Sequence, residues 1–225
     1  VKPETMNDFE LGTSFSNDYL VLNLNLYYML FENEIVKNGK VDRFGQPITG
    51  NVDQTTHIGA EVSAVFNLFN GLEIFGNASY SKNRITTGKY FINDTESIDI
   101  SENSISGFPE FLSNIGVQYN LKSLFLKLNA KYVGKFYSDN FDSNLNQYLL
   151  SYPDFVDYSD NVNDSYFVVD FYGSYEFNLF NGLTNSKLFL QVNNIFDNLY
   201  SAYAIGKEFF PAAERNFIAG FSIGL

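Results

Sequence analysis

The segment Leu20–Leu30 constrains the fold most, because its large apolar residues recur at every second position. One face of an extended chain would carry Leu20, Leu22, Leu24, Leu26, Tyr28 and Leu30. The opposite face would carry polar or smaller side chains, among them Asn23 and Asn25. A helix would scatter the leucines around its circumference, so this period of two predicts a β-strand.

Similar alternating runs recur along the chain and predict about nine strands. They lie near residues 9–13, 20–30, 57–66, 72–81, 109–119, 124–136, 166–177, 188–192 and 217–225. The connections alternate in length, with short turns at 14–18, 67–71, 120–123 and 178–186. Long polar loops are expected at 32–53, 81–108, 138–164 and 194–215. An up-and-down meander would place all the short turns at one rim, which is the pattern of outer-membrane barrels. The predicted fold class is therefore all-β, a transmembrane antiparallel up-and-down β-barrel.

Composition narrows the classes of function. The chain has 225 residues, no cysteine, an aromatic content of 18% and a formal net charge of −12. An acidic chain of this kind is unsuited to nucleic acid, whose binders need a basic surface. No apolar segment reaches the ~20 residues of a membrane helix, whereas barrel strands need only about 9–11 residues each. A mean hydropathy of −0.14 is compatible with such strands.

Short motifs then resemble one family. The C-terminal stretch has Asn194, Phe196, Asp197 and Tyr200, followed by Arg215 at the head of the last alternating run. Further matching positions are Pro3, Glu4, Glu10, Gly12, Gly59 and Gly134. Together they resemble the β-barrel domain of TonB-dependent outer-membrane receptors. The resemblance implies a barrel of about 22 strands. Residues 1–225 would be its C-terminal portion, incomplete alone, with the plug domain and earlier strands absent.

The resemblance also implies a function and partners. We expect active uptake of a ferric siderophore or a similar large scarce nutrient across the outer membrane of a Gram-negative bacterium. Expected partners are membrane lipid and lipopolysaccharide, the chain's own N-terminal plug, and TonB with ExbB and ExbD through the absent N-terminal region. No catalysis, cofactor or metal centre is expected. The alternatives are a passive porin-type channel or adhesin barrel, and a soluble β-sandwich binding module.

Charged residues predicted on the polar face are candidates for lining the interior. Lys127, Lys131 and Lys135 form a row that could steer an anion or pair with acids of the plug or of neighbouring strands. By resemblance, Glu61, Asp170 and Arg215 would support packing between the wall and the plug.

The 138–164 loop is aromatic and acidic. Its aromatic candidates, expected either to stack on a ligand or to pack the loop, are Tyr148, Tyr152, Phe155 and Tyr158. Its carboxylates are expected either to bind Ca²⁺ or, as we favour, to lie on a solvated loop: Asp139, Asp142, Asp154, Asp157, Asp160 and Asp164.

His57 is the only histidine, which excludes a multi-histidine metal site. Glu61 and the serines Ser63, Ser79 and Ser81 lie on the same predicted face, so a hydrolase triad is conceivable. We favour a polar residue facing the interior near the rim.

Overall fold

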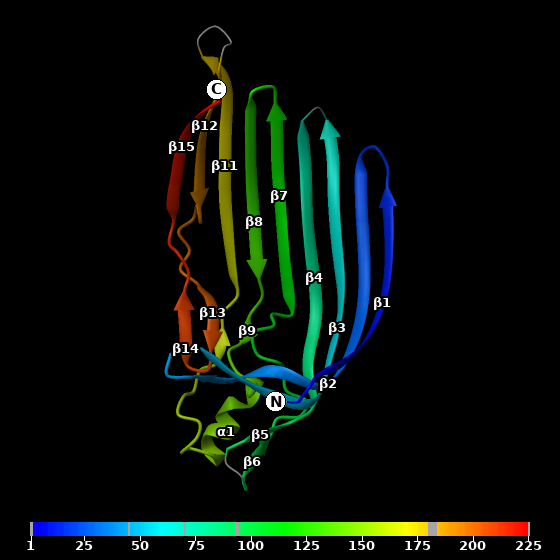
Figure 1. The fold of residues 1–225 in the computed structure, drawn as a ribbon, viewed down its shortest axis with the longest axis vertical. Helices are drawn as coiled ribbons and strands as arrows, with labels where there is room; N and C mark the ends of the chain where they lie inside the picture. The colour runs from blue at the N-terminus through cyan, green and yellow to red at the C-terminus, as the bar shows by residue number, and fades with distance from the viewer. Residues whose placement is uncertain (1, 45, 70, 93–94, 180–183, 225) are drawn as a thin grey trace.

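The computed structural model describes residues 2–44, 46–69, 71–92, 95–179 and 184–224. Its main element is a nine-stranded antiparallel sheet (Figure 1). In order across the sheet, the strands are β1 (Thr5–Ser16), β2 (Leu20–Val41), β3 (Pro47–Phe69), β4 (Leu72–Thr87), β7 (Phe111–Leu121), β8 (Leu124–Val133), β11 (Tyr166–Leu179), β12 (Thr184–Asn193) and β15 (Asn216–Gly224).

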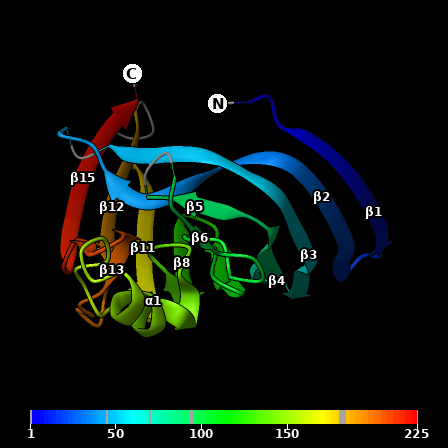
Figure 2. The ribbon, with the colours of Figure 1, turned by 90° about the horizontal axis from the view of Figure 1, so that it is seen from below.

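The topology is the predicted meander. Each main strand pairs with its neighbours in sequence order, and β1 and β15 form the two edges of the sheet. The sheet curves strongly about one side but does not close into a ring (Figure 2). The prediction of about nine strands that are incomplete alone is confirmed.

The strand register gathers the apolar residues on one surface, which we call the apolar face. Across the middle of the first strands, Leu11 lies opposite Leu26, Leu26 opposite Ala60, and Ala60 opposite Tyr80. The pattern continues to β15, where Phe221 lies opposite Leu188. Many of these side chains are exposed, which is costly in water and favourable in acyl chains. The other surface, the polar face, carries polar side chains such as Asn25, Glu61 and Asn129.

Glycines on the polar face lie under aromatic rings of the adjacent strand. The ring of Tyr27 covers Gly59, that of Phe75 covers Gly116, and that of Phe189 covers Gly220. A Cβ at any of these glycines would overlap the ring. The small residue therefore lets a large ring lie flat along the sheet, a pairing known to stabilise strands at glycine positions.

The short turns cluster at one end, as predicted. The Asn17 side chain accepts hydrogen bonds from the backbone N–H groups of Tyr19 and Leu20, at 2.9 and 2.8 Å. Gly71 and Lys122 adopt positive φ angles of 83° and 52°. The predicted second Asn-Gly turn, at 181–182, lies outside the described residues.

The prediction of a long polar loop at 32–53 is wrong. β2 and β3 continue as a paired hairpin to Val41 and from Pro47, past the point where the apolar alternation ends. At 22 residues β2 is about 70 Å long, more than twice the ~30 Å hydrocarbon layer. Polar side chains suit this extension because it stands beyond the apolar layer, while its backbone hydrogen bonds remain paired.

The hairpin extension bends across the open side of the curved sheet (Figure 2). At its far end, the Lys37 ammonium lies 4.4 Å from the ring centre of Tyr203, in the connection between β12 and β15. Asn140, in the connection after β8, donates a hydrogen bond of 2.7 Å to the Lys37 carbonyl. Two long connections therefore meet at the extension.

The remaining long connections also contain secondary structure. β4 runs to Thr87, so the predicted loop at 81–108 is shorter than expected. The small elements are β5 (Lys89–Phe91), β6 (Ser97–Asp99), β9 (Phe136–Tyr137), η1 (Asp142–Asn144), α1 (Leu145–Ser151), β10 (Val162–Asn163), β13 (Ser201–Ile205) and β14 (Glu208–Pro211). Within the described ranges, no helix is both long and apolar enough to cross a membrane.

A pair of arginine substitutions on β8 tests the assignment of the two faces. Leu128→Arg places a charge on the apolar face, and we expect it to lower the free energy of unfolding in lipid vesicles by about 2–4 kcal/mol. Asn129→Arg places the same charge on the polar face, opposite Asp170, and should change stability little. Urea titration of the full-length protein in vesicles measures both. Equal losses from the two variants would contradict the assignment.

Candidate functional site

The long connections fold together over a hydrophobic core at the end of the sheet away from the short turns. We call this assembly the loop layer. Its buried members come from β2, β3, β4 and the connections after β4 and β8: Val36, Val52, Ile85, Ile98, Ile100, Ile105, Phe141, Leu145 and Val156. Ile85 and Val156 have 0% exposure. The loop layer is therefore a packed unit, not a set of independent solvated loops.

Asp139 is buried at the centre of the 138–164 connection. Its carboxylate accepts hydrogen bonds from the Phe141 N–H at 2.8 Å, the Asn161 amide at 2.8 Å and the Tyr158 hydroxyl at 2.7 Å. Burial raises the pKa of Asp139, and these hydrogen bonds oppose the rise. The prediction of a solvated loop is wrong at this residue, whose carboxylate holds the two ends of the connection together.

A cavity of about 350 Å³ lies between the loops, and we call it the loop cavity. Its aromatic walls are Tyr90, Phe141, Phe155 and Tyr158. Tyr90 and Phe155 meet edge to face with ring centres 5.1 Å apart. The cavity's charged lining includes Lys207, whose ammonium lies 2.6 Å from the Asp157 carboxylate. Such a site offers flat surfaces for stacking and a few charges for orientation.

The four aromatic candidates of the 138–164 loop separate into two pairs. Phe155 and Tyr158 line the loop cavity, whereas Tyr148 and Tyr152 pack against the core without lining it. The Tyr148 hydroxyl donates a hydrogen bond of 2.9 Å to the Asp99 carbonyl. Sequence reasoning missed Tyr90 and Lys207, which lie in other connections and carry no motif.

Glu61, Lys127 and Lys131 occupy the polar face but do not converge. Glu61 lies opposite Asn25 and Ser79, and it has no polar partner among the described residues. The Lys127 ammonium lies 4.9 Å from the ring centre of Phe75. Lys131 lies opposite Asn114, also without a polar partner in the described ranges. Lys135 lies beyond the end of β8, so the expected row of three lysines contains two.

Asp170, on β11, and Arg215, just before β15, are both hydrogen-bonded to the turn that the Asn194–Tyr200 motif forms. Asp170 accepts a hydrogen bond from the Asn194 N–H at 2.8 Å, and Asp197 accepts one from the Arg215 N–H at 2.8 Å. Asn194 and Asp197 both adopt positive φ, 53° and 57°. Asparagine and aspartate tolerate this conformation better than most residues, which gives a physical reason for their place in the motif.

The other motif residues of the C-terminal half either contact neighbouring residues or are exposed. The Tyr200 ring stacks on Tyr166 with centres 4.3 Å apart, while Phe196 is exposed. A Cβ on Gly134 would come within 2.9 Å of the Phe111 carbonyl oxygen, so a close strand approach requires glycine there.

The N-terminal motif residues lie along exposed β1 and the segment before it. Glu4 accepts a hydrogen bond of 3.1 Å from the Ile35 N–H, and Glu10 accepts one of 3.4 Å from Asn25. Pro3 and Gly12 are exposed. These contacts fasten the first strand to β2.

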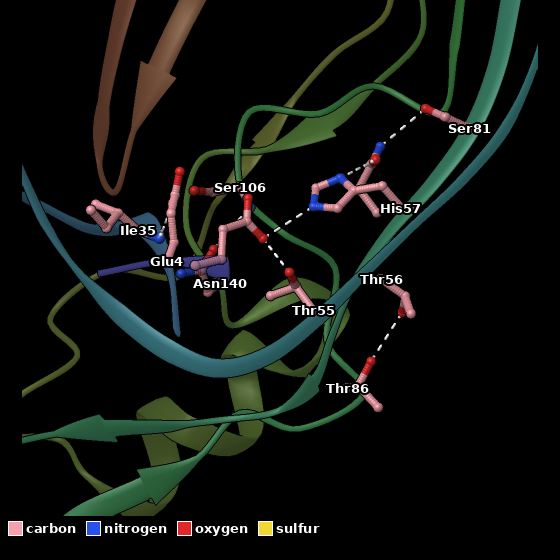
Figure 3. Close-up of polar contacts among 11 residues, drawn as sticks. Glu4, Ile35, Thr55, Thr56, His57, Ser81, Thr86, Ser106 and Asn140 are labelled. Atoms are coloured by element: carbon pink, nitrogen blue, oxygen red, sulfur yellow. Dashed lines mark hydrogen bonds and ion pairs between the residues drawn. The ribbon is translucent and has the colours of Figure 1, made fainter. Parts of the chain in front are cut away.

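His57 belongs to a chain of hydrogen bonds that does not form a hydrolase triad (Figure 3). Its Nε2 lies 3.0 Å from Glu34 and its Nδ1 lies 2.7 Å from the Asn83 amide oxygen. Ser81 accepts a hydrogen bond from Asn83, not from the imidazole, and Glu61 is not a partner of His57. The ring is buried between Phe31 and Phe108. The arrangement joins the hairpin extension to the wall. Among the described residues the imidazole has no hydroxyl partner, and the hydroxyl that donates to Glu34 belongs to Thr55, which is not one of the predicted serines.

Removing the Asp139 carboxylate tests whether it organises the loop layer. Asp139→Ala leaves three donors without their acceptor, and each buried donor left unpaired costs about 1–3 kcal/mol. We expect the 138–164 connection to become sensitive to protease while the sheet stays folded. The exposed Gln147→Ala on α1 is the matched control. Unchanged protease resistance in Asp139→Ala would refute this role.

The tyrosines of the loop layer predict a loss of its stability at alkaline pH. Burial raises the pKa of Tyr90 to about 12, and burial together with Asp139 raises the pKa of Tyr158. Because the folded-state pKa exceeds the unfolded value of 10.0, the contribution of Tyr90 is complete below pH 10 and is lost as pH rises through 12. The difference in tyrosinate absorbance between the full-length protein and Tyr90→Phe should titrate near 12. A midpoint near 10 would show that Tyr90 is solvated.

Comparison with known proteins identifies the family to which this chain belongs. Residues 1–195 match the family described as "TonB dependent receptor-like, beta-barrel". Similar solved structures include the ferric-catecholate import receptor Fiu from E. coli K12 (21% identity, TM-score 0.69), the siderophore receptor PiuA from Acinetobacter baumannii (20%, 0.72) and the ferric citrate transporter FecA (19%, 0.70).

The match covers 97–99% of this chain but only 28–32% of those three. A search of curated proteins found no match. The family match over most of the chain and the shared fold along nearly its whole length lead to one conclusion. The chain belongs to the TonB-dependent receptor family, and its sheet is part of that family's β-barrel.

Proposed function

We propose that this chain forms the C-terminal wall and part of the outer mouth of a TonB-dependent transporter in the outer membrane of a Gram-negative bacterium. Its cargo would be a ferric siderophore or a similar large, scarce nutrient. The apolar face would lie against outer-membrane lipid and lipopolysaccharide. The loop layer would project from the cell, and the short turns would lie in the periplasm. No step of this function requires catalysis by these residues.

The observation that carries the proposal is the loop cavity above a sheet with one apolar and one polar face. Membership of the family supports active transport, and three similar structures are described as a ferric-catecholate import receptor, a siderophore receptor and a ferric citrate transporter. Aromatic walls of the kind formed by Phe155 and Tyr158 suit the planar groups of many iron chelators. We propose that Tyr148 and Tyr152 support these walls from behind.

The polar face would meet the plug domain. Glu61 and Lys131 have no polar partners among the described residues, and charged groups enclosed in a barrel need partners or water. We propose that the plug supplies them, as part of the wall-to-plug packing. TonB, energised by ExbB and ExbD, would act on the plug through the N-terminal region of the complete receptor. Movement of the plug would then open a path along the polar face.

Deleting the gene tests the transport function. We expect the deletion strain to lose uptake of a labelled ferric siderophore under iron starvation and to regain it with the complete gene. Uptake should also disappear in a strain without TonB. Uptake that persists without TonB would favour a passive channel. No uptake defect across catecholate, hydroxamate and citrate complexes would refute iron transport.

Two substitutions in the loop layer distinguish an effect on ligand binding in the loop cavity from a general effect on folding. In the complemented strain, Phe155→Ala should weaken binding of the transported complex by about 2- to 10-fold through loss of ring contacts. Leu150→Ala is the matched control, because Leu150 is 83% exposed on α1 and does not line the cavity. Equal effects of the two variants would place the ligand elsewhere.

A further inference from the structure

A second cavity, of about 310 Å³, lies between the 160–165 segment and residues 199–201 together with Phe209. We call it the acidic cavity. Its charged lining residues are Asp160 and Asp164, and none of the residues that line it is basic. Ser165, Tyr200 and Ser201 add further oxygen atoms to the lining. The composition disfavours an anion and suits a cation that prefers oxygen.

Asn163 supplies an independent observation at the same place. It is 1% exposed and lines the acidic cavity. Its amide nitrogen donates to the Ser201 carbonyl at 3.0 Å, which fixes the orientation of the amide group. Its amide oxygen is buried and accepts no hydrogen bond from the described residues. A buried acceptor without a donor costs free energy, and a cation bound to this oxygen would offset that cost.

We propose that the acidic cavity binds a calcium ion through the Asn163 amide oxygen and the carboxylates of Asp160 and Asp164. Ca²⁺ takes oxygen ligands in flexible geometry and accepts amide and backbone carbonyls beside carboxylates. The described residues contain no group of three or more acids, histidines or cysteines arranged for a metal. This site offers two carboxylates and one amide, which should bind a cation more weakly than three or more carboxylates would. Affinity in the range of extracellular calcium modules, about 10⁻⁴–10⁻³ M, is therefore expected.

The position of the ion gives it a structural effect. The 138–164 connection and the connection after β12 already meet here through the Asn163–Ser201 hydrogen bond, and Tyr166 at the start of β11 stacks on Tyr200 beside it. Both connections also line the loop cavity, with Tyr158 from one and Lys207 from the other. Calcium would hold the two connections together beside the loop cavity. Calcium binding by these residues does not depend on which nutrient is transported.

Calcium titration of the complete receptor, refolded free of lipopolysaccharide, tests the site. We expect saturable calorimetric binding of Ca²⁺ and tyrosine-sensitised Tb³⁺ luminescence that Ca²⁺ displaces. Asp164→Asn and Asn163→Leu should each weaken this binding at least about tenfold, since each removes a ligand from a small set. Calcium should also protect the 160–165 segment from hydrogen exchange in the unsubstituted receptor but not in Asp164→Asn.

Asp53→Asn is the charge-matched control, because Asp53 is an exposed aspartate of β3 that does not line the cavity. Its Ca²⁺ titration should match that of the unsubstituted receptor. Heat-dependent mobility on gels confirms that each variant has folded. Absence of saturable binding up to about 10 mM Ca²⁺ would overturn the proposal. So would Ca²⁺ binding by folded Asp164→Asn and Asn163→Leu receptors that is as tight as binding by the unsubstituted receptor. Displacement of Tb³⁺ by Mg²⁺ as readily as by Ca²⁺ would overturn the assignment to calcium.

Discussion

Pairing of backbone hydrogen bonds between neighbouring strands is the constraint on which the rest of the structure depends. In acyl chains no water replaces a missing partner, so each unpaired N–H or C=O group costs several kcal/mol. The inner strands satisfy this condition on both sides, whereas β1 and β15 each pair on one side only. Such edges are stable in a membrane only if further strands complete the ring. The open sheet is therefore consistent with its being one part of the closed barrel of this family.

The strand register follows from the same environment. A slip of one residue would turn the leucines of Leu20–Leu30 toward the polar interior and would turn Asn23 and Asn25 toward lipid. The rings over Gly59, Gly116 and Gly220 add a second condition on the polar face, because each ring fits only over a residue without a side chain. Lipid thus fixes which face is apolar, and ring-on-glycine pairs reinforce the alignment of individual strands.

Sequence predicted the wall well and the loop layer poorly, for a physical reason. In the wall, each strand can be predicted from its own residues, as Leu20–Leu30 shows, because lipid imposes an apolar period of two on each strand separately. In the loop layer, Val36, Ile85 and Val156 come from distant segments and become a core only after the chain folds. The extended β2–β3 hairpin was missed because its polar residues have no apolar alternation, although its backbone pairing continues. The Asn194–Tyr200 motif identified the family, but its role became clear only from the hydrogen bonds of Asp170 and Asp197.

The separate core gives the loop layer a source of stability that the membrane does not supply. Lipid and the backbone hydrogen bonds between strands stabilise the wall. Asp139 and the buried isoleucines stabilise the loop layer, which is surrounded by water. The hairpin extension joins the two regions, since it leaves the wall at β2 and β3 and contacts Asn140 and Tyr203 at its far end. A ligand in the loop cavity would touch residues from several connections at once. Because a ligand stabilises the arrangement that it binds best, its binding would favour the closed association of these connections.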